Sequence, residues 1–174
     1  MTERILIAGI GNVFLGDDGF GVAVAQRLAK RHLPAGVVVM DAGIRGLDLT
    51  YALMDHYDAA ILVDATQRGG APGTLYVIEP EPDLEPPSLL DAHSMQPARM
   101  LAFLRASGSR LGLLRIVGCE PERFGSDEDP CMELSPRVEA SLDAATDLVE
   151  SVMSDMLEAL SGGAVAPKAG GGHA

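Results

Sequence analysis

Three apolar runs in the first 66 residues constrain the fold of this chain more than any other feature. They are RILIAGI (4–10), GVVVMDAG (36–43) and AAILVDAT (59–66). Each run is continuously apolar rather than alternating, as strands are when both faces of their sheet are covered. Apolar residues at helical spacing over 18–32, and a shorter helical segment at 47–54, separate the runs. This strand–helix alternation predicts a parallel α/β sheet with helices on both faces.

The rest of the chain is expected to add two strands to this sheet. The run at 73–80 follows the third strand too closely for a crossover helix, so we expect it to run antiparallel to that strand. Further on we expect a loop at 80–92, a helix at 94–107, a strand at 111–120 and a long helix at 134–160. The prediction is a single three-layer α/β domain over 1–160, with a mostly parallel, twisted five-stranded sheet that has one antiparallel strand. The glycine-rich segment 161–174 is expected to be a disordered tail.

Charge and composition exclude several classes of partner. The chain has 25 acidic and 13 basic residues, for a net charge of −12. Nucleic acids and anionic membranes attract basic surfaces, so neither is expected to bind here. No apolar run approaches the roughly 20 residues of a membrane span, and the first residues do not resemble a signal peptide. We therefore expect a soluble, cytoplasmic protein.

Acidic residues follow the first three predicted strands. Asp18 comes after the first, Asp41 ends the second and Asp64 ends the third. The carboxyl edge of a parallel sheet is where its loops converge and where ligands bind. His93 is expected at the same edge, because the helix that it precedes must run downward to meet the start of the strand at 111–120. The topology therefore predicts that Asp18, Asp64 and His93 share one rim.

Two carboxylates and one imidazole can bind a divalent transition metal and leave positions open for water or substrate. Each residue also has an ordinary structural explanation. Asp17 and Asp18 are placed to cap the first helix, and for Asp17 this is the explanation we favour. Asp41 suits a turn or the ribose-binding position of a dinucleotide fold, Asp64 is ordinary at a strand end, and His93 suits a loop carbonyl.

A dinucleotide-binding oxidoreductase is the alternative that the glycines of the first loop suggest. The fingerprint G-x-G-x-x-G is not matched, however, because the loop is GIGNVFLG and its third glycine is displaced. Two carboxylates at the start of the helix would also repel a pyrophosphate. The loop is better suited to a cation.

Six segments of the chain form a recognisable series: GIGNVFLGDDGFGV, DAGIRGLDL, ILVDATQRGGAPGTLYVI, HSMQPARMLAFL, IVGCEPE and LSPRVEASL. In residues and in order, over roughly residues 4–157, they resemble the motifs of the [NiFe]-hydrogenase maturation endopeptidases. Members of this family remove a C-terminal extension from the hydrogenase large-subunit precursor.

The resemblance implies a role for each of five residues. The family's nickel-binding positions fall on Asp18, Asp64 and His93, which are also the implied catalytic residues, and the segment from Asp41 to Gly43 corresponds to one associated with choosing the substrate. The nickel is implied to belong to the precursor, and the free enzyme is expected to be a monomer. A non-catalytic nickel checkpoint or chaperone for hydrogenase assembly remains an alternative.

Overall fold

The computed structural model describes residues 2–44, 46–55, 57–81, 97–109 and 111–162. The strands are β1 (Ile5–Ile10), β2 (Val37–Gly43), β3 (Ala59–Ala65), β4 (Leu75–Ile78) and β5 (Leu113–Cys119). The helices are α1 (Phe20–Leu28), α2 (Gly46–Met54), α4 (Pro97–Ala106), α5 (Pro136–Ala140) and α6 (Leu142–Ser161), and a 3-10 turn, η1 (Asp17–Gly19), precedes α1. Each predicted strand is present, within a few residues of its expected bounds.

The five strands form one sheet in the order β2-β1-β3-β5-β4. The pairs β1–β2, β1–β3 and β3–β5 are parallel, and β4 pairs antiparallel with β5. The predicted fold class is therefore confirmed. The direction of β4 is also as predicted, opposite to β3, but β5 lies between the two strands and is the hydrogen-bonded neighbour of β4.

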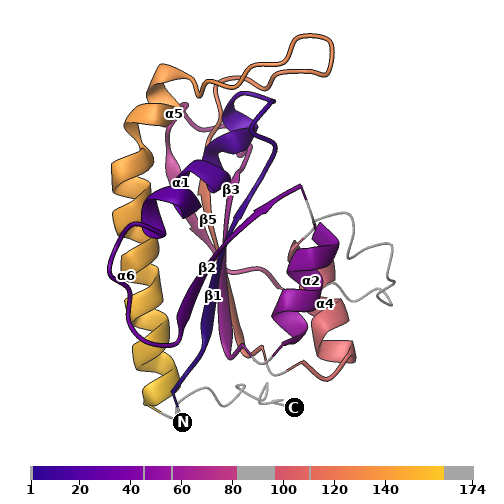
Figure 1. Ribbon diagram of the computed structural model, residues 1–174, viewed down its shortest axis with the longest axis vertical. Coiled ribbons are helices and arrows are strands. Elements are labelled where there is room, and N and C mark those ends of the chain that lie inside the picture. The colour runs from indigo at the N-terminus through magenta and orange to yellow at the C-terminus, as the bar shows by residue number, and fades with distance from the viewer. Residues whose placement is uncertain (1, 45, 56, 82–96, 110, 163–174) are drawn as a thin grey trace, which may run out of the picture.

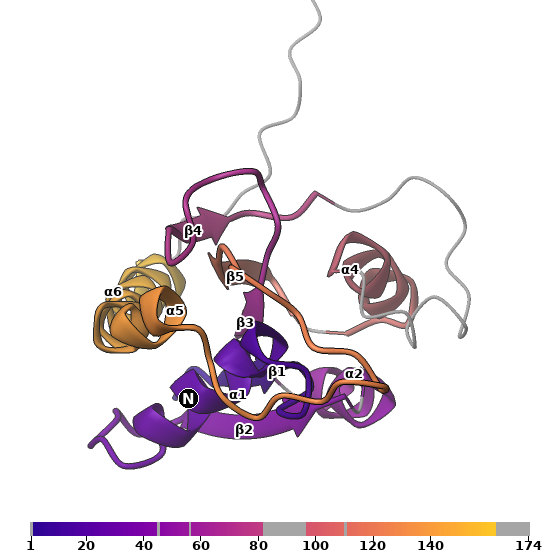
Figure 2. The ribbon, with the colours of Figure 1, turned by 90° about the horizontal axis from the view of Figure 1, so that it is seen from above.

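Helices cover both faces of the sheet (Figure 1, Figure 2), with α1, α5 and α6 on one side and α2 and α4 on the other. Along β1, Ile5 and Ile7 are buried in the core cluster on the α1/α6 side, while Leu6 and Ala8 are buried in the cluster on the α2/α4 side. Both faces of this strand are buried from solvent, which is why its sequence is continuously apolar.

Two glycines let α1 lie directly against the sheet. A Cβ on Gly21 would lie 2.0 Å from the carbonyl oxygen of Val63 in β3, and a Cβ on Gly9 would lie 2.2 Å from the carbonyl oxygen of Gly21. No side chain fits at either distance, so only glycine permits this approach of helix and strand. The contact sets the position of η1, and with it the position of Asp18, relative to β1 and β3.

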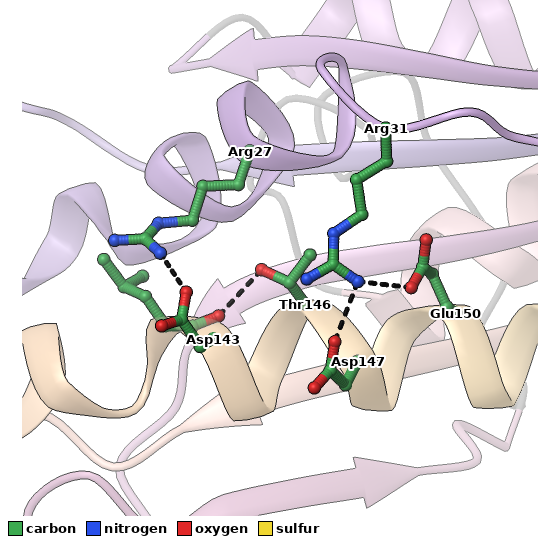
Figure 3. Close-up of polar contacts among 7 residues, drawn as sticks. Arg27, Arg31, Asp143, Thr146, Asp147 and Glu150 are labelled. Atoms are coloured by element: carbon green, nitrogen blue, oxygen red, sulfur yellow. Dashed lines mark hydrogen bonds and ion pairs between the residues drawn. The ribbon is translucent and has the colours of Figure 1, made fainter.

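Ion pairs join α1 and the turn that follows it to α6 across the surface of the protein (Figure 3). Arg27 pairs with Asp143, and Arg31 Nη1 lies 2.8 Å from Asp147 Oδ1 and 2.5 Å from Glu150 Oε2. These groups are partly or largely exposed to solvent, where such pairs contribute little to stability. The apolar face of α6, buried against the sheet in the same cluster as α1, holds the helix in place.

Two predicted helices differ from the structure in their bounds. The helix expected over 18–32 ends at Leu28, where the N–H groups of Lys30 and Arg31 bond three residues back and form turns. The long helix expected over 134–160 is broken at Ser141 into α5 and α6. There the N–H of Ser141 bonds to the carbonyl of Val138, three residues back, instead of continuing the regular helical pattern.

Within the residues described, no helix is long and apolar enough to cross a membrane. The domain bounds 1–160 and the disordered tail stay predictions, and residues 163–174 lie outside the described part of the chain.

Candidate functional site

The loop between β1 and α1 returns Asp18 to the end of β1. Gly11 has a φ of 132° and Gly16 a φ of 64°, a region that favours glycine. A Cβ on Gly11 would lie 1.7 Å from the carbonyl oxygen of Asp18. The glycines that resemble those of a nucleotide-binding loop therefore permit a tight turn. The turn brings the backbone of Asp18, at the end of the loop, against Gly11 at its beginning.

The carboxylate of Asp18 is held by the backbone of this loop. The N–H of Asn12 donates to Asp18 Oδ2 at 2.9 Å, and Asn12 Oδ1 accepts a bond from the N–H of Phe14 at 3.0 Å. One oxygen of Asp18 thus has a fixed partner. The side chain is partly exposed at the carboxyl edge of the sheet, where it can meet a ligand.

Asp64 lies near the end of β3, on the same edge. Burial, and then the negative charge of Asp18, raise the pKa of Asp64 to about 7, against a smaller opposing effect of the Ala65 N–H. The structure therefore brings Asp18 and Asp64 close enough to repel each other when both are ionised. A shared cation relieves such repulsion, and carboxylate pairs of this kind are common at functional sites.

His93 lies outside the described residues, so its predicted place beside Asp18 and Asp64 stays a prediction. Only a short connection separates the end of α4 from β5, whose start lies at the amino edge of the sheet. Helix α4 therefore runs toward the amino edge, with its N-terminal end facing the carboxyl edge, as the predicted topology requires. In the part of the chain that the structure describes, no three His, Cys, Asp or Glu side chains gather as a metal site.

Asp17 is not the helix cap that the sequence suggested. Its side chain is fully buried and bonds to residues more than a hundred positions later in the chain. Asp17 Oδ2 accepts the N–H groups of Glu122 and Arg123 at 2.8 and 2.9 Å and the hydroxyl of Ser135 at 2.9 Å, while Oδ1 accepts the N–H of Ser135 at 2.7 Å. Asp17 therefore anchors the loop 121–135 to the loop between β1 and α1, which carries Asp18 and is called the Asp18 loop below.

These hydrogen bonds decide the charge state of Asp17. Burial acts to raise its pKa, but the N–H groups of Arg123, Ser135 and Glu122 together outweigh burial and hold the pKa below its ordinary value. The two adjacent aspartates thus have different tasks: Asp17 is a buried structural anion, whereas Asp18 faces the rim.

The end of β2 lies against the same loop. The N–H of Gly11 donates to the carbonyl of Gly43 at 2.9 Å, and Gly43 has a φ of 52°. Asp41 pairs in register with Gly9 and its side chain is exposed. The structure therefore places both proposed substrate-recognition residues beside the Asp18 loop, at the surface.

A polar network that the sequence did not predict joins the end of β5 to the loop after β3 and to β4. Glu120 accepts the N–H groups of Arg68 and Gly69 at 2.8 and 3.2 Å and the hydroxyl of Tyr76 at 2.8 Å. The Arg68 N–H, more than any other group, lowers the pKa of Glu120. The network fixes the loop after β3; the only signal in the sequence was one acid directly after β5.

The fold and these residues define a class: a three-layer α/β domain whose carboxyl edge presents a pair of carboxylates suited to a cation. Residues 22–152 match the family model HycI, hydrogenase maturation protease. The chain is 32% identical over 158 residues to the Hydrogenase 2 maturation protease of Escherichia coli K12, covering 87% of this chain and 92% of that protein. It is 34% identical over 149 residues to the hydrogenase expression/formation protein HupD of Rhodobacter capsulatus, covering 82% and 68%.

Solved structures agree with this result. The hydrogenase maturating endopeptidase HybD from E. coli superposes with a TM-score of 0.72 at 29% identity, over 88% of this chain and 93% of that one. The chain belongs to the hydrogenase maturation protease family, as the sequence motifs predicted.

Proposed function

We propose that this chain is a processing endopeptidase that removes the C-terminal extension of a [NiFe]-hydrogenase large-subunit precursor once nickel has been inserted. The observation that carries the proposal is the pair formed by Asp18 and Asp64 on the carboxyl edge of the sheet, where burial, and then the charge of Asp18, raise the pKa of Asp64 to about 7. Membership of a family whose relatives are named as maturation proteases and endopeptidases supports the peptidase activity.

In this proposal the nickel arrives with the substrate. Asp18 and Asp64 supply oxygen ligands, His93 supplies an imidazole, and the precursor keeps its own ligands to the same ion. A site of two carboxylates and one imidazole suits a divalent transition metal and leaves positions open for such sharing. A precursor without nickel would meet two carboxylates that have no cation between them, so processing would depend on metal insertion.

The residues around the metal position have two tasks in this proposal: Asp64 exchanges a proton, and Asp41 and Gly43 contact the precursor. Asp64 is partly protonated near neutral pH, so it would release a proton to solvent on binding the cation and would hold the ion as a carboxylate. Nickel held there would supply Lewis-acid polarisation of the peptide bond. Asp41 and Gly43, at the surface beside the Asp18 loop, contact the precursor and select it. The enzyme acts in the cytoplasm and is a monomer until it meets its substrate.

The decisive experiment mixes the purified protein with nickel-loaded precursor and follows the mass of the precursor. We expect a loss equal to the C-terminal extension, and no change for precursor without nickel. Asp18→Ala and His93→Ala should abolish the mass shift without unfolding the protein, while Asp127→Ala, which removes an exposed acid from the loop 121–135, should process normally. A stable complex without cleavage would instead support the checkpoint or chaperone.

A further inference from the structure

A cavity of about 450 Å³ opens directly beside Asp64, on the α2/α4 side of the sheet. Its aliphatic lining comes from three strands in register: Leu62 pairs with Ile116, and Ile116 pairs with Ile78. Ile10, at the end of β1, completes this floor. All four side chains belong to, or pack against, the apolar cluster on this face. The floor of the cavity is therefore a continuous aliphatic surface.

The rim of the cavity is polar. Asp64 lies two residues after Leu62 on the same strand, so both side chains point to the same face of the sheet. Thr66 and Arg68 continue the wall. Arg68 is held in place, because its N–H donates to Glu120 and its guanidinium lies 5.6 Å from the centre of the Tyr76 ring. An apolar floor with a few fixed polar groups at its edge is typical of a ligand pocket.

The neighbour of Asp64 in β5 explains one wall of this pocket. Gly118 pairs with Asp64, and a Cβ on Gly118 would lie 2.6 Å from Thr66 Oγ1. The glycine lets the Thr66 side chain lie over β5, at the side of the cavity. Figure 1 shows α2 and α4 beside the lower half of the sheet, whereas Asp64 and Thr66 of the pocket lining come from the carboxyl end of β3 and the loop after it.

We infer that this pocket is the specificity subsite of the peptidase, and that it takes the aliphatic side chain of a residue adjoining the scissile bond. The inference rests on the proposed function. A side chain next to the bond must lie within a few ångströms of the residues that hold the reacting group, and Asp64 is both a proposed metal ligand and part of the pocket wall. An aliphatic group would bury against Leu62, Ile78 and Ile116, whereas a charged group would lose its hydration without a partner in the floor.

The test uses nickel-loaded precursor in which the residues on either side of the cut are changed, one at a time, to Leu, Met, Gly, Asp or Lys. For the wild-type protein we expect Asp or Lys at one of the two positions to lower kcat/KM roughly 100-fold or more relative to Leu or Met. Equal rates for aliphatic and charged residues at both positions would overturn the inference and leave the proposed function standing.

Variants of β4 assign the effect to the pocket. Ile78→Asp puts a carboxylate in the floor, so we expect slower processing of the Leu precursor and at least about tenfold faster processing of the Lys precursor than by wild type. Val77→Asp is the matched control, since its side chain is 49% exposed on the opposite face of the same strand. The same shift in preference with Val77→Asp would contradict the assignment.

Two further measurements keep the outcome decisive. If Ile78→Asp does not fold, Ile78→Phe narrows the pocket and should move the preference from Leu toward Gly; an unchanged preference would refute the subsite.

If the wild-type protein cuts no precursor, the proposed function fails by itself. The pocket is then tested by titrating a peptide of the precursor C-terminus and following the methyl resonances of Ile78 and Ile116, which should shift with Leu but not with Asp at the critical position; no shift with either peptide refutes it.

Discussion

Replacement of Asp64 by asparagine should stabilise the metal-free protein at alkaline pH while removing its function. Burial and the charge of Asp18 raise the pKa of Asp64 from 3.8 to about 7. The folded protein therefore keeps a proton that the unfolded chain releases between about pH 4 and pH 7. Over that interval the unfolded state binds fewer protons, so ionisation of Asp64 lowers the free energy of unfolding as the pH rises. The amide of asparagine has no charge, so the Asp64→Asn variant is free of this loss.

The size of the effect follows from the shift. Three pKa units at 1.36 kcal/mol each give about 4 kcal/mol over the whole titration, of which about 3 kcal/mol falls between pH 4.5 and pH 8. We expect the difference in unfolding free energy between Asp64→Asn and wild type to grow by about that amount, in favour of the variant, between these two pH values. Titrating groups that do not interact with Asp64 contribute equally in both proteins and cancel in this difference.

Urea denaturation at pH 4.5 and pH 8, with a chelator present, measures both free energies of unfolding. Asp41→Asn is the control, since it removes an exposed carboxylate from the same edge and should change stability by less than about 0.5 kcal/mol at either pH. A difference between Asp64→Asn and wild type that is the same at both pH values would show that Asp64 is ionised equally in both states, and the reasoning from burial and repulsion would be refuted.

Four further predictions concern the site and the scaffold. Nickel affinity, measured by calorimetry, should rise about tenfold per pH unit below pH 7 from deprotonation of Asp64 alone; a flat profile would contradict its role as a ligand. Asp17→Ala leaves its buried donors without an acceptor and should cost about 3 kcal/mol or more in urea denaturation, with faster proteolysis of the loop 121–135. Gly21→Ala forces a Cβ to within 2.0 Å of a main-chain oxygen of β3 and should cost at least about 3 kcal/mol, whereas Gly112→Ala, with its nearest atom at 3.6 Å, should be tolerated. Arg31→Ala removes only exposed ion pairs, so the melting temperature should change by less than about 4 °C, and a larger loss would mean that α6 depends on them.

Most of the fold was predictable because its signals are local. The apolar run of β1 is buried on both faces, and the pattern of both faces is present in six consecutive residues. The direction of β4 also followed from local information, since the chain before it is too short to cross over the sheet. Its neighbour did not follow, because β5 enters the sheet about forty residues later and pairs with β4 from the other side.

The two adjacent aspartates differ in a way that depends on distant parts of the chain. Both suit the start of a helix, so sequence alone separates them poorly. The difference arises from Ser135 and the N–H groups of Glu122 and Arg123, more than a hundred residues away, which surround Asp17 and leave Asp18 at the rim. A hydrogen-bond partner at that distance has no signature next to the residue that it holds.

Local sequence thus sets the strands, the tight glycine turn and the presence of acids at strand ends, since these depend on the backbone preferences and apolar pattern of a few consecutive residues. Packing of distant segments sets the rest. The pKa of Asp64 depends on burial by neighbouring strands and on the approach of Asp18, and the aliphatic pocket beside it exists only because β3, β5 and β4 align Leu62, Ile116 and Ile78 in one row. Burial and register are properties of the assembled sheet, so no single segment of the chain contains them.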